Sequence, residues 1–172
     1  VYAAAFLVFL AMYLIPTQLP FHLQGLGAGS PGQAGIAIGI GSVTMVPAAL
    51  YYGRIRDRLG TGGVFALGFA LMAAALLVIG GAGSYRTVVA AMLLSGLGLG
   101  VLIPNLTTTA VAMAPPAARG RVSGGLMASI FLGQFLSPLA SQPWIGWFGV
   151  TAPFRDMGLL LTLIAVATAG VA

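Results

Sequence analysis

The residues best suited to do chemistry lie in a short polar stretch, Gly53 to Gly60, between two long apolar runs. Between the two glycines it holds Arg54, Asp57 and Arg58. A carboxylate such as Asp57 pairs with an arginine or accepts hydrogen bonds from a helix N-terminus. The glycines allow a sharp reversal and the close approach of a neighbouring helix. The pattern predicts a conformational latch. The alternative, in which the arginines only anchor a loop to anionic headgroups, gives Asp57 no role.

Uncharged polar side chains inside the apolar runs form the second group of candidates. Each amide, Asn105 or Gln134, needs partners for two donors and an acceptor, so both are costly to leave facing lipid. A substrate path and hydrogen bonding between helices explain the amides equally well. For the hydroxyls, hydrogen bonding between helices, or for the threonines back to their own helix, is the favoured interpretation. The candidates for a substrate path are Thr44, Asn105, Thr108 and Gln134.

The chain offers no convincing catalytic or metal-binding residue, and we predict no cofactor. It has no cysteine and one histidine, His22, which we expect in an outward loop without a role. An intramembrane serine protease needs a Gly-x-Ser-Gly setting, which neither Ser95 nor Ser123 has. An aquaporin-like channel needs two Asn-Pro-Ala boxes, and only a reversed Pro-Asn pair is present. Asp156, next to Arg155, is expected to form a simple ion pair.

Composition defines the elements that must position these residues. Of the 172 residues, 59% are hydrophobic and 5% are charged, with a mean hydropathy of +1.06, whereas soluble domains are roughly a quarter charged. A hydrocarbon core about 30 Å thick is crossed by roughly 20 apolar residues in a helix. We therefore predict an all-α polytopic membrane protein with six transmembrane helices and no room for a soluble domain. The expected spans are 1–15, 33–52, 63–81, 87–113, 122–144 and one that starts near 154.

Prolines, glycines and aromatic residues suggest where the spans end and how they pack. Pro16 and Pro20 are expected to close the first span before a loop at 17–32. The second span should end at the headgroup level with Tyr51 and Tyr52, before a tight polar loop at 53–62. Glycines four residues apart predict close helix approach at two pairs, Gly35 with Gly39 and Gly96 with Gly100.

The arginines predict the orientation in the membrane. The chain has seven arginines, no lysine and a net charge of +5, and cytoplasmic loops retain positive charge. The other loops hold only Arg86 and Arg155, whereas the loops after the second and fourth spans hold Arg54, Arg56, Arg58, Arg119 and Arg121. We expect those two loops and both chain ends to be cytoplasmic. The arginines form no nucleic-acid-binding face. Abundant Ala, Gly and Arg favour a bacterial cytoplasmic membrane.

The stretch Gly-x-Ile-x-Asp-Arg-Leu-Gly at 53–60 resembles the cytoplasmic loop motif of the major facilitator superfamily. Its trailing basic residues are replaced here by Thr61, Gly62 and Gly63. Further stretches in matching order resemble the C-terminal half of that family: Leu19-Pro20-Phe21-His22-Leu23-Gln24, Pro104-Asn105, Arg119-Gly120-x-x-Ser123-Gly124 and Gly133-Gln134-Phe135-Leu136-Ser137-Pro138. The resemblance implies that 1–172 is a C-terminal six-helix transmembrane bundle, a fragment that lacks its N-terminal half.

The same resemblance implies a function and partners. Asp57 would contact a helix end of the N-terminal half, and the first, second, fourth and fifth spans would border a central cavity. The partners would be the lipid bilayer, the other half and a small-molecule substrate. The expected activity is secondary transport, specifically proton-coupled efflux of hydrophobic or weakly polar compounds such as drugs. Import of a sugar or another neutral metabolite is the alternative. The spans carry no carboxylate, so a titrating group is expected in the other half.

Overall fold

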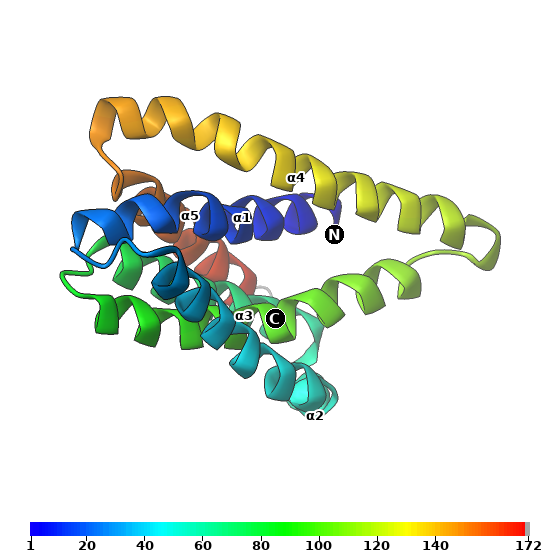
Figure 1. The fold of residues 1–172 in the computed structure, drawn as a ribbon. Coiled ribbons are helices and arrows are strands. Elements are labelled where there is room, and N and C mark those ends of the chain that lie inside the picture. Colours follow the sequence, from blue (N-terminus) through cyan, green and yellow to red (C-terminus); the bar gives the residue numbers. More distant parts are fainter. Residues whose placement is uncertain (171–172) are drawn as a thin grey trace.

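The computed structural model describes residues 1–170, and it is built from helices joined by short connections (Figure 1). The sequence prediction of an all-α polytopic membrane fold is confirmed. Five of the helices are long and apolar enough to cross a membrane. The elements are α1 (Tyr2–Gly25), α2 (Pro31–Gly80), α3 (Tyr85–Ala112), the short 3-10 helix η1 (Pro116–Ala118), α4 (Arg119–Phe148) and α5 (Ala152–Ala169).

The 50-residue α2 is two helices joined at Gly60. A straight helix of that length would measure about 75 Å at ~1.5 Å per residue, far more than one bilayer crossing needs. Gly60 has φ 68° and ψ 177°, a backbone conformation open to glycine and strained for other residues. The ribbon turns back near the α2 label in Figure 1. Residues 31–59 form the first limb and residues 61–80 the second limb, so the fold has six spanning segments.

Two sequence predictions of helix ends were wrong. The first span does not stop at residue 15, because α1 continues through Pro16 and Pro20 to Gly25, and the loop is only 26–30. Prolines are tolerated in membrane helices where hydroxyls and neighbouring helices satisfy the freed backbone groups. Next to Pro16, the hydroxyl of Thr17 donates to the carbonyl of Tyr13 at 2.7 Å, which adds a side-chain hydrogen bond to this turn of the helix.

The expected polar loop at 53–62 is also helical, except at Gly60. The helix continues through the arginines to Leu59, and only Gly60 departs from helical geometry. Arginine is a good helix former, so its charge calls for water around the side chain and not for a break in the backbone. The remaining ends agree with the prediction to within about two to four residues, the usual error of such estimates.

α3 packs tightly between the two limbs of α2. An added Cβ at Gly96 would meet Gly41 and Thr44 of the first limb, and one at Gly100 would meet Met45 and Ala48. Between them Gly98 faces Gly68 and Met72 of the second limb. The predicted close approach at Gly96 and Gly100 is confirmed. For Gly35 and Gly39 it was wrong, because a Cβ at either position would meet nothing within 4 Å.

Two further pairings complete the bundle. α1 and α4 lie side by side, with Gly133 of α4 against the main chain of Phe6 and Leu10 (Figure 1). α5 packs on the second limb, where Gly158 lies against Leu77. The connections 26–30, 81–84 and 149–151 gather at one end of the bundle, on the left in Figure 1. The Gly60 turn and the segment 113–118 lie toward the other end.

Candidate functional site

The predicted latch residues lie on the last turns of the first limb and are open to the surroundings. The side chains of Arg54, Asp57 and Arg58 are exposed, and Arg54 lies over the Tyr51 ring at 5.4 Å. Within residues 1–170, Asp57 has neither an ion-pair partner nor a hydrogen-bond partner. A latch built on Asp57 would therefore take its partner from outside this chain.

The two glycines that flank the latch differ in their geometry. Gly60 supplies the reversal, as its positive φ shows. Gly53 is helical, and a Cβ built on it would meet nothing within 4 Å. At a spacing of four residues Gly53 shares its helix face with Asp57, and this face is open among the described residues.

Asn105 and Thr108, two of the predicted path residues, come together around a phenol at the turn. The Nδ2 of Asn105 donates to the carbonyl of Thr61 at 3.1 Å. The hydroxyl of Tyr52 donates to the Oδ1 of Asn105 at 3.1 Å and lies 2.7 Å from the Oγ1 of Thr108. Asn105 is fully buried. Its amide is therefore occupied between α3 and both limbs of α2.

The other two path candidates lie elsewhere. Thr44 donates to the carbonyl of Leu93 at 2.9 Å, joining the first limb to α3 about three turns before Asn105. Gln134 is half-buried on α4 and makes no hydrogen bond among the described residues. Among these four residues, Gln134 is the one whose polar group is free for a ligand.

Sequence reasoning missed the role of Tyr52. It was expected at the headgroup level together with Tyr51, but it is 8% exposed and holds the network around Asn105. Tyr51 is exposed, as expected. The useful signal was the helical spacing, because Tyr52 lies four residues after Ala48 on the same face, and both pack in one buried cluster.

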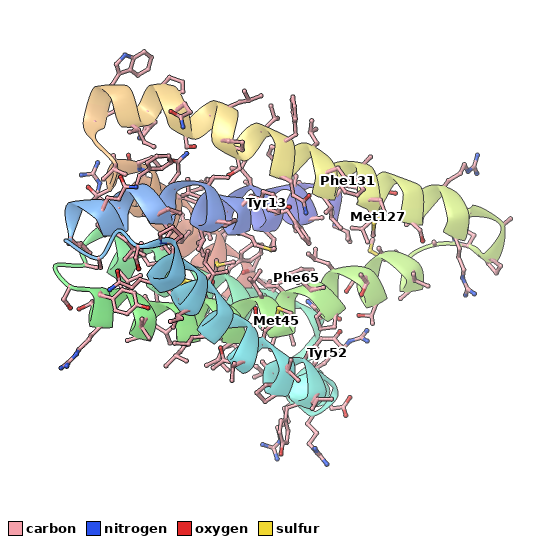
Figure 2. All side chains as sticks on the ribbon, viewed as in Figure 1. Tyr13, Met45, Tyr52, Phe65, Met127 and Phe131 are labelled. Atoms are coloured by element: carbon pink, nitrogen blue, oxygen red, sulfur yellow. The ribbon has the colours of Figure 1, made fainter. Side chains whose placement is uncertain are left out.

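A pocket of about 200 Å³ opens between α1, the first limb of α2 and α3. Three methionines line it, Met12, Met45 and Met92, together with aliphatic side chains and the hydroxyl-bearing Ser42 and Ser95. Figure 2 labels Met45 on the first limb. No lining residue is charged. Methionine side chains are flexible and polarisable, so such a pocket adapts to apolar molecules of different shapes. The pocket is lined by three of the four spans that the resemblance implied around a central cavity, the first, the second and the fourth.

Two other hollows offer less for recognition of a solute. The larger, of about 540 Å³ between the second limb and α5, is lined by alanine, leucine and valine with one threonine. The other, of about 260 Å³ between α1, α4 and α5, includes Trp144 and Asp156. There the indole of Trp144 and the guanidinium of Arg155 both donate to Asp156, at 2.9 and 2.8 Å. The expected ion pair of Asp156 with Arg155 is confirmed.

His22 lies in a different place from the expected loop. It is in the last turn of α1, 4% exposed, with its ring 6.0 Å from that of Phe154. The expectation failed because α1 does not end at Pro16. His22 follows the pocket-lining Pro16 by six residues, about 9 Å along the helix.

Six apolar spanning segments define a polytopic membrane protein, and three of them, α1, the first limb of α2 and α3, line an uncharged, methionine-lined pocket. The family model of the Major Facilitator Superfamily matches residues 1–171, and the chain belongs to that family. A search of curated proteins finds no match.

Two solved structures share the fold. They are a mutant of the peptide transporter POT in complex with sulfate (TM-score 0.78, 22% identity) and the same mutant with alafosfalin (TM-score 0.77, 23% identity). They match 97% and 96% of this chain. The chain spans 36% of the length of either transporter.

Proposed function

We propose that this chain is one six-helix half of a secondary active transporter, the C-terminal half, which rocks against a second half around a site near the bilayer midplane. Family membership and the six spanning segments support this proposal. The chain matches only 36% of the length of the two solved transporters, which leaves room for a second half. The unpartnered Asp57 then has a natural contact, a helix end of that second half.

The methionine-lined pocket is the observation that carries the proposed substrate class, hydrophobic or weakly polar organic compounds such as drugs. A charged solute in a water-excluded pocket needs an opposite charge or a set of hydrogen bonds. Met12, Met45 and Met92 offer neither, and the hydroxyls of Ser42 and Ser95 add only weak polarity. We also propose that Gln134 of α4, which does not line this pocket, contacts the substrate elsewhere along its path.

We propose proton-coupled efflux as the transport mode. The carboxylate of Asp57 lies at a helix end and that of Asp156 is held by Arg155 and Trp144. Neither lines the methionine-lined pocket. The second half would therefore supply the titrating group, because a coupling carboxylate has to reach the substrate path.

The test uses the intact transporter in proteoliposomes with an imposed proton gradient and three probes: a neutral hydrophobic dye, a dipeptide and a neutral sugar. We expect gradient-driven movement of the dye only. Dipeptide transport would point to the substrate named for the solved relatives, and sugar transport would favour the importer. Either result without dye transport would contradict the proposed substrate class.

A matched pair of variants links the dye to the pocket. Met45→Gln keeps the length of the side chain but puts an amide into the pocket, so the KM for the dye should rise roughly tenfold. Met113→Gln, at a methionine that is 73% exposed and outside the pocket, serves as the control and should leave the KM unchanged. Equal effects of the two substitutions would show that the pocket does not bind the dye.

A further inference from the structure

The turn at Gly60 needs an external support. Glycine populates many backbone conformations, so Gly60 alone does not fix the angle between the two limbs of α2. That angle sets the direction in which the exposed end of the first limb, with Asp57, points. A clamp would have to hold residues on both sides of Gly60 at the same time.

Asn105 of α3 makes contacts on both sides. Its Nδ2 reaches the carbonyl of Thr61, the first residue after the turn, and its Oδ1 accepts from Tyr52, two helical turns before it. Both halves of the amide are used in these two contacts, which are each 3.1 Å long. One fully buried side chain thus joins α3 to both limbs.

Thr108 holds the phenol that completes the clamp. Its Oγ1 lies 2.7 Å from the hydroxyl of Tyr52 and 2.7 Å from the carbonyl of Pro104. The phenol therefore lies between two oxygen atoms of α3, the Oδ1 of Asn105 and the Oγ1 of Thr108. This arrangement restricts the Tyr52 ring and with it the end of the first limb.

An apolar cluster surrounds the clamp. Ala48 and Tyr52 of the first limb, Val64 of the second limb and Val101 of α3 form a buried group separate from the main core. A dry environment strengthens the hydrogen bonds of Asn105 and makes an unpartnered amide there costly. Asn105 does not line the methionine-lined pocket, so the clamp is distinct from the proposed substrate contact.

We infer that Asn105 is a positioning residue, which fixes the Gly60 turn so that Asp57 is presented to the second half of the transporter. The inference rests on the proposed function. A loosened turn would lose the latch and change the rate of exchange between access states. It would leave substrate binding in the pocket as it is.

The transport test compares Asn105→Leu, Asp57→Asn and the double variant in the intact protein, with the dye as the substrate. We expect either single variant to lower the maximal rate roughly tenfold at an unchanged KM. The double variant should be no slower than Asp57→Asn alone, because Asn105 acts through that carboxylate. Independent multiplicative losses, or a raised KM in Asn105→Leu, would overturn the inference and place Asn105 on the substrate path.

Thr107→Val is the matched control. The hydroxyl of Thr107 bonds only to carbonyls of its own helix, those of Ile103 and Pro104, so its removal should leave transport unchanged. A loss in Thr107→Val equal to that in Asn105→Leu would mean that any polar change in this part of α3 is harmful, and the inference would fail.

A distance measurement separates this inference from the proposed function. Residues 1–172 have no cysteine, so once any cysteine of the second half is replaced, Leu59→Cys on the first limb and Val111→Cys on α3 place two spin labels at exposed positions. In Asn105→Leu the distance distribution should broaden relative to the parent and to Thr107→Val. An unchanged distribution would overturn the inference even if transport is confirmed. A broadened one would support the clamp even if the protein moves none of the three probes.

Discussion

At the scale of single residues, the polar side chains inside the spans serve mostly to join helices. Thr44 bonds across to α3, and Asn105 bonds to both limbs of α2. In lipid the alternative to such a bond is an unpartnered polar group, which is why these residues end up paired within the bundle. Gln134 differs, since its amide has no hydrogen bond among the described residues. We interpret it as the side chain left free for substrate.

The sequence shows which polar residues are costly in a membrane but not which partner each of them takes. Asn105 and Gln134 have the same chemistry, and both were expected to serve either a substrate path or a helix contact. Only the tertiary arrangement distinguishes them, because the partners of Asn105 are a tyrosine 53 positions away and a backbone carbonyl 44 positions away. Such long-range pairings leave no local periodicity in the sequence.

The first residue-scale prediction concerns Tyr52. Replacing Tyr52 by Phe removes the hydroxyl but keeps the ring, so the Oδ1 of Asn105 loses its partner in a buried place. We expect a loss of about 1 kcal/mol in stability. This corresponds to a fall of about 2–4 °C in the Tm of the detergent-solubilised protein.

Tyr51→Phe is the control for this measurement, because Tyr51 is 56% exposed and donates no hydrogen bond within residues 1–170. Its Tm should stay within about 1 °C of that of the parent. Equal shifts in the two variants would contradict a special role for the Tyr52 hydroxyl.

At the scale of elements, the glycines of α3 decide how the helices pack. Apolar helices in lipid gain little from burial alone, so they associate through close contact at small residues. Gly96 and Gly100 bring α3 against the first limb and Gly98 brings it against the second. The four-residue spacing correctly predicted this contact on α3, but it equally predicted one at Gly35 and Gly39 that this chain does not make.

Helix ends were the least predictable feature at this scale. The prolines of α1 and the glycines at 53 and 60 were interpreted with rules from water-soluble proteins, where both residue types mark breaks. Inside a bilayer an open backbone costs more than a distorted helix, so α1 continues through Pro16 and Pro20. A reversal between Gly53 and Gly60 was expected, and the structure makes it at Gly60 while Gly53 stays helical. Residue type alone does not distinguish the two positions, because glycine adopts either conformation.

The element-scale prediction replaces one glycine by a larger residue. Gly96→Val would press side-chain atoms into the backbone of Gly41 and the hydroxyl of Thr44, which overpacks the contact between α3 and the first limb. We expect a cost of about 1–3 kcal/mol and a fall in the fraction of monodisperse protein after solubilisation. Size-exclusion chromatography measures the monodisperse fraction after solubilisation. The loss of that fraction after heating to a series of temperatures measures the change in thermal stability.

Gly35→Val is the comparison that isolates packing from helix propensity. It makes the same chemical change in a helix, at a position where an added Cβ meets nothing within 4 Å. Its thermal profile should match that of the parent to within about 0.5 kcal/mol. If Gly35→Val proves as damaging as Gly96→Val, the tight contact is not the cause of the loss.

At the scale of the whole molecule, charge and connectivity together define an orientation. The Gly60 turn and the segment 113–118 lie toward one end of the bundle (Figure 1). Five arginines are next to them in the chain, in the last turns of the first limb and at the start of α4: Arg54, Arg56, Arg58, Arg119 and Arg121. The opposite end holds the connections 26–30, 81–84 and 149–151. On the basis of the positive-inside rule, we propose that the arginine-rich end faces the cytoplasm of a bacterial cell.

The last prediction tests this orientation in intact cells. Because the chain has no cysteine, Ser84→Cys and Arg58→Cys each introduce one thiol at an exposed position, at opposite ends of the bundle. A membrane-impermeant maleimide should label Ser84→Cys in intact cells and should label Arg58→Cys only after the membrane is opened. Six crossings put residues 58 and 84 on opposite faces, because the second limb alone separates them. Labelling of Arg58→Cys in intact cells, with Ser84→Cys protected, would invert the orientation. The turn that carries Asp57 would then face outward, where it could not serve as a cytoplasmic latch.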